Sequence, residues 1–200
     1  MRAIIIEMEF VEEGWRSSIL SSLCCQCPLD AHAGCCRIKS TLFWGDLGYI
    51  ARHHPELFPV ILNKSSAQLL PHGVNYECID DKCTFIKQKG CELPAAAKSL
   101  MCRTFACRGL DLENHPIGKV WLVALARLYR EECQKNSELA RKVAGFRLKH
   151  PLDLMDKVDQ FLAEYAAAYY AEPRWIKEII GERSLQVRLS KVDLLAWELH

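Results

Sequence analysis

Cysteine is the most constraining feature of this 200-residue chain, because it occurs eleven times and ten of these positions fall between residues 24 and 107. In an exported protein this density predicts a disulfide framework. The N-terminal apolar run ends at Ile6, before Glu7, and is too short for a signal peptide or a membrane span. We therefore expect a cytoplasmic protein with reduced thiols, in which metal ligation is the leading interpretation.

The rest of the composition is that of an ordinary globular protein. Half of the residues are hydrophobic, and 26 lysines and arginines nearly cancel 25 aspartates and glutamates. Such a chain can bury a core, but it lacks the net positive charge that attracts nucleic acids or acidic membranes. We expect neither a nucleic-acid partner nor a membrane.

The cysteines form an early and a late group. Two residues separate Cys24 from Cys27, a spacing that lets one turn bring two thiolates to the same metal at small entropic cost. Zinc prefers four ligands of this kind, and iron–sulfur clusters are also held by four thiolates. The sequence leaves open whether the chain holds one metal centre or two. The expected ligands are Cys24, Cys27, Cys35, Cys36, Cys83, Cys91, Cys102 and Cys107.

The other cysteines and the nearby basic residues have simpler expected roles. Cysteine is common as a small buried apolar side chain, which is the role expected for Cys25, Cys78 and Cys133. Basic residues that lie close to a cysteine are expected to lower thiol pKa values and to donate hydrogen bonds to sulfur. These residues are Arg37, Lys39, Lys82, Lys87, Lys89, Lys98, Arg103 and Arg108.

The order of the cysteines resembles a known pattern. The adjacent pair Cys35-Cys36 follows the early spacing, and the late group ends in Cys102-Arg-Thr-Phe-Ala-Cys107. This order is similar to that of the YkgJ-type cysteine-cluster family, described as zinc- or iron-chelating, over roughly residues 24–107. The resemblance implies a metal-binding protein that holds zinc or an iron–sulfur cluster. Some relatives are flagellin lysine N-methylases, so the resemblance also implies a protein-lysine N-methylase-like enzyme as an alternative.

Two further functions stay open. A metal-stabilised interaction module would present Trp121, Trp175 or Trp197 to a protein partner, provided that these side chains are exposed. A dithiol relay would use the Cys24–Cys27 spacing, but the βαβ context typical of thioredoxin-like proteins is absent from the sequence pattern.

Periodicity predicts the secondary structure. Apolar spacings of three and four residues predict a helix from Pro116 and another between Pro151 and Pro173, with further helical turns at 175–180 and 194–199. Charged residues are expected to form a solvated face of the helix that begins at Pro116. They are Lys135, Arg141, Lys142, Arg147 and Lys149, with the intervening Glu131, Glu132 and Glu138. A shorter helix is expected from Gly45 to His53, before Pro55.

The first half of the chain is expected to contain little regular structure. A strand and a helix are both open for residues 1–22. Residues 74–79 and 83–87 are predicted to pair as a hairpin, and residues 184–188 alternate like a strand. The predicted fold is mainly α, with a small β-hairpin. An irregular cysteine-rich, metal-organised region spans 1–112, and a helical region at 113–200 packs on it as one compact unit.

Overall fold

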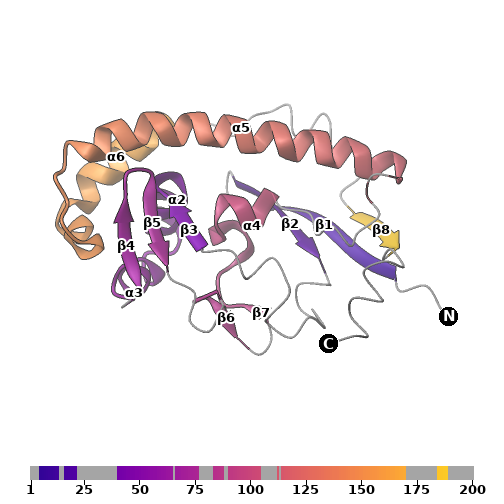
Figure 1. Ribbon diagram of the computed structural model, residues 1–200, viewed down its shortest axis with the longest axis horizontal. Coiled ribbons are helices and arrows are strands. Elements are labelled where there is room, and N and C mark those ends of the chain that lie inside the picture. Colours follow the sequence, from indigo (N-terminus) through magenta and orange to yellow (C-terminus); the bar gives the residue numbers. More distant parts are fainter. Residues whose placement is uncertain are drawn as a thin grey trace.

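Helices hold more of the described chain than strands do, so the fold is mainly helical. The longest, α5 (Pro116–Ala144), runs along most of the long axis of the molecule (Figure 1). The predicted helical turns at 175–180 and 194–199 lie outside the described residues. The structure is a computed structural model, and it describes residues 5–13, 16–21, 40–64, 66–76, 83–87, 90–104, 112, 114–169 and 184–188.

The beginning and the buried face of α5 follow from the sequence. Pro116 occupies its first turn, and Nδ1 of the N-cap residue His115 accepts a hydrogen bond from the Gly118 N–H at 3.3 Å. The predicted helix is therefore confirmed. Trp121 is fully buried, which removes it as a partner-binding side chain, whereas Trp175 and Trp197 lie outside the described residues. The buried stripe of α5 contains Trp121, Ala124, Leu125, Leu128, Glu132, Asn136, Leu139 and Val143.

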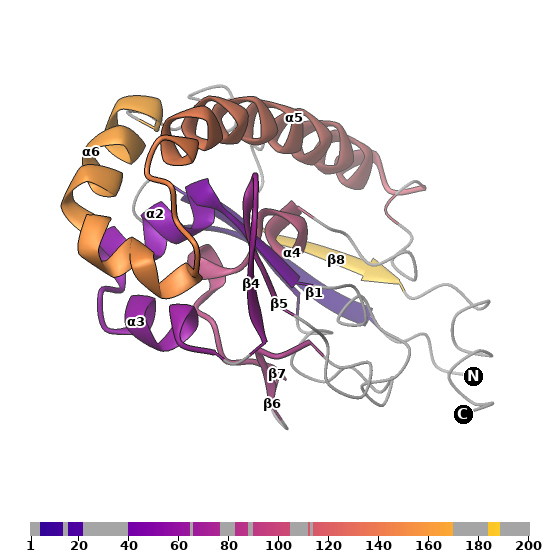
Figure 2. The ribbon, with the colours of Figure 1, turned by 60° about the vertical axis from the view of Figure 1, so that its left-hand side comes forward.

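Three helices gather at one end of α5 (Figure 2). They are α2 (Trp44–His53), α3 (Leu57–Leu62) and α6 (Val158–Ala168), and α2 packs against both α5 and α6. The helix expected from Gly45 to His53 is confirmed. The helix expected after Pro151 is also present, but its first part, Pro151–Lys157, is a 3-10 helix.

Two glycines let α2 and α6 approach closely. A Cβ atom added to Gly48 would overlap the ring of Tyr165, and one added to Gly45 would overlap Tyr169. Both tyrosines are buried and stack on one another, with ring centroids 5.0 Å apart. The helix crossing therefore depends on the absence of side chains at these positions.

The central sheet corrects the predicted hairpin. β5 (Gly73–Tyr76) pairs with β3 (Ser40–Phe43) on one side and with β4 (Ala67–Leu70) on the other, both antiparallel. β6 (Ile86–Lys87) pairs instead with β7 (Gly90–Cys91). The prediction that the two segments pair is therefore wrong for their described residues, because β3 and β4 occupy both edges of β5 and β6 pairs with β7. Of the second segment only residues 86–87 form a strand, and residues 77–79 lie outside the described residues.

Residues 40–76 also correct the expectation that the cysteine-rich region at 1–112 is irregular and metal-organised. Except for Ser65, which is not described, this stretch forms α2, α3 and the β3–β5–β4 sheet with short connections. Its apolar side chains build a core with those of α5 and α6, which stabilises the fold without any cysteine. The largest fully buried members from this stretch are Tyr49, Tyr76, Phe58, Leu42 and Leu47.

A second antiparallel sheet joins the two ends of the chain. β1 (Ile5–Glu13) pairs with β2 (Arg16–Ser21) and, on its other side, with β8 (Ser184–Arg188). The strand expected at 184–188 is confirmed, and residues 5–13 and 16–21 resolve as strands. Among the helices of the described ranges, none combines the length and the apolar character needed to cross a membrane.

Candidate metal centre

Two of the predicted ligands lie together at the β6–β7 hairpin. Ile86 pairs with Cys91, and the Glu92 N–H donates to the Phe85 carbonyl at 2.8 Å, so the hairpin continues toward Cys83. Cys83 is half-buried and packs against the hydrophobic core, whereas Cys91 is exposed. The two thiols are close enough for a charge on Cys83 to act on Cys91. The structure thus brings together ligands that are eight positions apart in the sequence.

The electrostatics of Cys91 suit a ligand that changes its protonation state on binding. Partial burial of the sulfur raises the pKa of Cys91, and the N–H of Leu93 and the charge of Lys98 lower it. Charges on Cys83 and Glu92 raise it further. Two neighbouring thiolates repel each other, so a bound cation would favour losing both protons. The donor set at this hairpin therefore fits a thiophilic metal.

A third predicted ligand, Cys102, lies on α4 (Leu100–Thr104). Its backbone N–H donates to Oγ of the buried Ser99 at 3.3 Å, which caps the first turn of this helix. The Cys102 side chain is exposed, whereas Leu100 and Arg103 on the same helix are buried. Cys102 is therefore presented away from the core.

These three cysteines do not make a complete site by themselves. Within the described ranges, no three histidine, cysteine, aspartate or glutamate side chains are close enough to hold one metal ion. Zinc and iron–sulfur centres take four protein ligands in their common structural forms. The other predicted ligands, Cys24, Cys27, Cys35, Cys36 and Cys107, lie outside the described residues.

Arg103 takes a different role from the one expected. It was predicted to act on thiols, but its guanidinium lies in the core with none of its surface exposed, between a carboxylate of α2 and one of α5. Nη2 is 3.7 Å from Oδ1 of Asp46 and 3.7 Å from Oε2 of Glu132, both of which are also buried. This ion cluster of Asp46, Arg103 and Glu132 carries one positive and two negative formal charges.

Glu132 corrects a second expectation, because it is buried rather than part of a solvated face. Its position carries a signal that was available in the sequence. The buried stripe of α5 passes from Leu128 to Leu139 through Glu132 and Asn136, so two polar residues occupy core-facing positions. Polar side chains on such a stripe require buried partners, and here they have them.

Two backbone N–H groups donate hydrogen bonds to the Asp46 carboxylate of the ion cluster. Oδ2 of Asp46 accepts hydrogen bonds from the N–H of Phe43 at 2.9 Å and from the N–H of Leu100 at 3.1 Å. One carboxylate therefore caps α2 and also holds the first residue of α4. The buried charge of Asp46 is tolerated because this carboxylate accepts two hydrogen bonds and lies near a cation.

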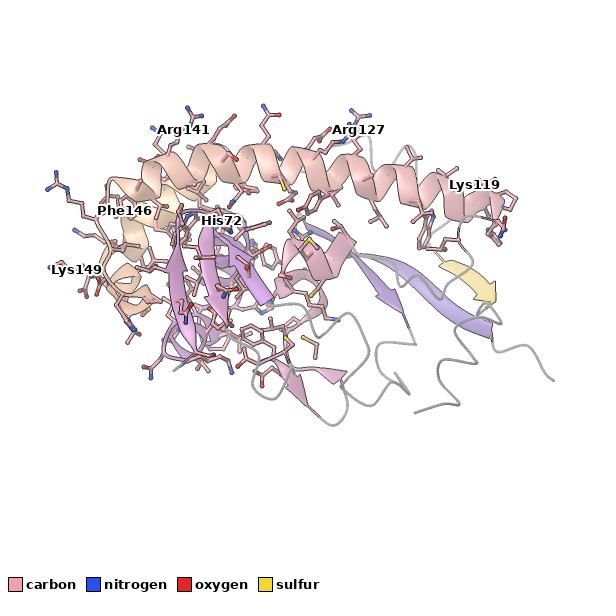
Figure 3. The ribbon with its side chains drawn as sticks, viewed as in Figure 1. His72, Lys119, Arg127, Arg141, Phe146 and Lys149 are labelled. Atoms are coloured by element: carbon pink, nitrogen blue, oxygen red, sulfur yellow. The ribbon has the colours of Figure 1, made fainter. Side chains whose placement is uncertain are left out.

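Asn136 ties the same region to the central sheet. Its Oδ1 accepts from the Gly45 N–H at 3.1 Å, and its Nδ2 donates to the His72 carbonyl at 3.0 Å. Figure 3 shows His72 at the turn between β4 and β5, just beneath α5. Together with the ion cluster, these bonds join α2, α4, α5 and the β3–β5–β4 sheet.

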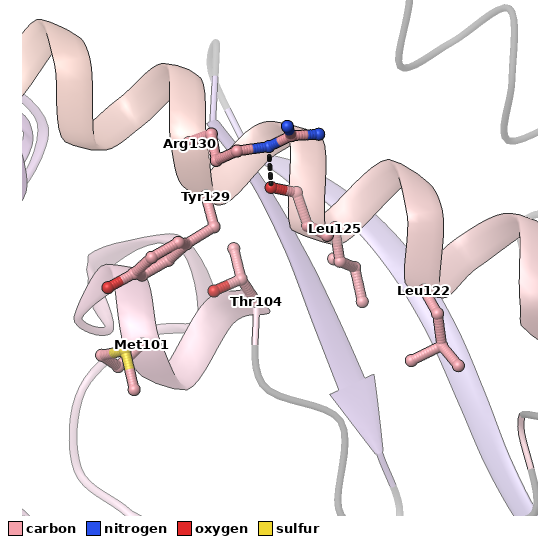
Figure 4. A pocket seen from close by; sticks show the side chains of 7 residues that line it. Met101, Thr104, Leu122, Leu125, Tyr129 and Arg130 are labelled. Atoms are coloured by element: carbon pink, nitrogen blue, oxygen red, sulfur yellow. Dashed lines mark hydrogen bonds between the residues drawn. The ribbon is translucent and has the colours of Figure 1, made fainter.

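A hollow of about 590 Å³ lies between α4 and α5 (Figure 4). Tyr129 of α5 faces α4 across it. Partial burial raises the pKa of Tyr129, and a hydrogen bond with the Cys133 side chain raises it further. The lining is mostly apolar, which is typical of binding pockets but names no ligand. The hollow is lined by Met101, Thr104, Leu122, Leu125, Ala126, Tyr129 and Arg130.

Comparison with models of protein families, with curated proteins and with solved structures finds no match for this chain. The resemblance to the YkgJ-type family therefore stays a prediction from the cysteine order.

Proposed function

We propose that this protein binds a metal through cysteine thiolates, as zinc or as an iron–sulfur cluster. The observation that supports the proposal is that the β6–β7 hairpin brings the thiols of Cys83 and Cys91 within electrostatic reach of each other. Cys83 packs against the core, but Cys91 is exposed, so core packing does not account for the second thiol. Cys102, exposed on α4, is a third proposed ligand.

The remaining proposed ligands are Cys24, Cys27, Cys35, Cys36 and Cys107, as the cysteine order implies. The elements at 40–76 pack in one core with α5 and α6, so the metal is proposed to link the cysteine-bearing segments rather than to hold the whole fold together. This makes a structural, sensing or electron-transfer centre the function we favour. Zinc has no redox chemistry, so a zinc centre would be structural or sensing, whereas an iron–sulfur cluster could serve any of the three roles.

Anaerobic purification followed by elemental analysis and an absorption spectrum of the same sample tests the proposal. Iron with labile sulfide and a brown colour would identify a cluster, and stoichiometric zinc in a colourless sample would identify a zinc centre. A wild-type protein that holds neither, and that takes up neither on reconstitution, would refute metal binding.

Serine variants locate the site. The double variant Cys83→Ser/Cys91→Ser should lower the metal content per chain, because serine hydroxyls replace two thiolate donors. Cys133→Ser is the matched control, since this cysteine lies on α5 and outside the proposed set, and its metal content should equal that of the wild type. Full metal content in the double variant would exclude the hairpin pair as ligands.

A further inference from the structure

We infer that Arg103 is a positioning residue for the proposed ligand Cys102, fixing the rotation of α4 through its ion pairs with Asp46 and Glu132. This inference rests on the proposed metal-binding function. It assigns a role to the arginine that directly follows Cys102, and that role operates through the core rather than through the sulfur.

The geometry of a short helix makes neighbouring residues dependent on one another. Successive side chains of an α-helix are about 100° apart around its axis, so fixing one side chain fixes the direction of the next. Arg103 and Leu100 are both buried and, three positions apart, lie on the same face of α4. Once that face is held in the core, Cys102 must point outward, as its exposure shows.

A helix of five residues cannot hold this orientation by its own stability, because isolated helices of such length are not stable in water. The tertiary contacts must therefore do so. Asp46 holds α4 at two points, since Oδ2 accepts from the Leu100 N–H at 3.1 Å and Oδ1 lies 3.7 Å from Arg103 Nη2. Glu132 adds a third point from α5.

The segment that leads to Cys102 is anchored as well. Between Cys91 and Cys102, the side chains of Leu93, Ala96 and Ala97 are buried, and so is that of Ser99. The relative placement of the two cysteines is thus set by the core before any metal binds. Preorganised ligands lose less conformational freedom on binding, which raises affinity.

An arginine suits this position because it can meet carboxylates from two different helices at once. Asp46 belongs to α2 and Glu132 to α5, and both approach the same Nη2 atom. An apolar side chain would fill the space, but it would not select one rotation of α4 over another with the same directional preference. The expected consequence of its loss is weaker metal binding in a chain that still folds.

The test compares metal affinity in variants of the full-length chain. Arg103→Met removes the cation. Arg103→Met/Glu132→Leu also removes one of the two carboxylates that pair with Arg103, while Asp46 keeps its two N–H donors. This second variant keeps the test valid if the first does not fold. Arg103→Lys is the conservative variant.

Two controls separate positioning from stability. Leu154→Ala removes a fully buried side chain on the 3-10 helix, and it lowers stability without touching α4. Arg127→Met makes the same chemical change at an exposed arginine on α5. Zn²⁺ affinity is measured by competition with a chromophoric chelator, and the Co²⁺-substituted protein reports thiolate coordination through its absorption bands. Circular dichroism checks the fold of each variant.

We expect folded Arg103 variants to bind Zn²⁺ about 10- to 100-fold more weakly, as is typical when a residue that orients a ligand is lost. Their Co²⁺ spectra should show weaker thiolate bands, Arg103→Lys should restore part of the affinity, and both controls should match the wild type. A folded double variant with wild-type affinity and an unchanged Co²⁺ spectrum would overturn the inference alone. A wild-type protein that binds no metal would overturn the proposed function, and this inference with it.

Discussion

Replacing Arg103 by methionine is expected to cost a large part of the protein's stability. The side chain is fully buried, and its removal leaves Asp46 and Glu132 as two buried carboxylates without their shared cation. Breaking a buried ion pair by removing one partner typically costs about 3–5 kcal/mol. Methionine fills much of the space of the arginine stem, so little of this cost comes from a cavity.

The hydrogen bonds that Asp46 accepts from Phe43 and Leu100 remain in the variant, so we expect the lower end of this range, about 3 kcal/mol. For a chain of this length, that corresponds to a melting temperature lower by about 6–12 °C. Guanidinium unfolding of metal-free protein, followed by the fluorescence of the buried residues Trp44 and Trp121, measures the free energy of unfolding.

A second variant checks the electrostatic origin of this loss. Arg103→Met/Glu132→Leu should recover at least about 1 kcal/mol relative to Arg103→Met, because one of the two buried carboxylates that lost the arginine cation is gone. Arg127→Met, at an exposed i,i+4 pair with Glu131, should change stability by no more than about 0.5 kcal/mol. A loss below about 1 kcal/mol in Arg103→Met, or additive losses in the double variant, would refute the buried-charge explanation.

Three further predictions concern other parts of the fold. Gly48→Ala should lower the free energy of unfolding by about 1–3 kcal/mol in guanidinium titrations, because the new methyl group overlaps the ring of Tyr165; an unchanged midpoint would contradict the close helix crossing. Asp153→Ala should lower the melting temperature at pH 7, because backbone N–H donors hold the pKa of this carboxyl below its ordinary value and so stabilise the folded state. The difference should shrink as the pH falls below the ordinary aspartate pKa of about 3.9 and the carboxyl is protonated, and a pH-independent difference would refute this. Tyr129→Phe should slow the alkylation of Cys133 at pH 8, measured by peptide mass mapping. Burial raises the pKa of this thiol and the tyrosine hydroxyl lowers it, so loss of the hydroxyl leaves less thiolate. Faster alkylation would show that the tyrosine only shields the sulfur.

Local patterns account for the parts of the fold that the sequence predicts well. The helix at 116–144 is predicted by apolar spacings of three and four and by Pro116 in its first turn. The end of the helix at 44–53 is predicted by Pro55. The strand at 184–188 is predicted by its alternation of apolar and polar residues. For the helices the deciding interactions are between residues close in the chain, so the signal is present in a short window. The alternation at 184–188 is also local, although the partner strand, β1, is distant in the sequence.

Strand pairing and buried charge are decided only by tertiary structure. Which strand pairs with β5 depends on segments up to 36 residues away, Ser40 against Tyr76, and nothing within β5 specifies this choice. Likewise Arg103, beside a cysteine in the sequence, meets carboxylates from helices that precede and follow it. The cysteine positions alone name the candidate ligands and their chemistry. The placement of Cys83 beside Cys91, and the outward direction of Cys102, come from a hairpin and a core that form only when distant segments pack together, because burial and pairing are properties of the whole fold.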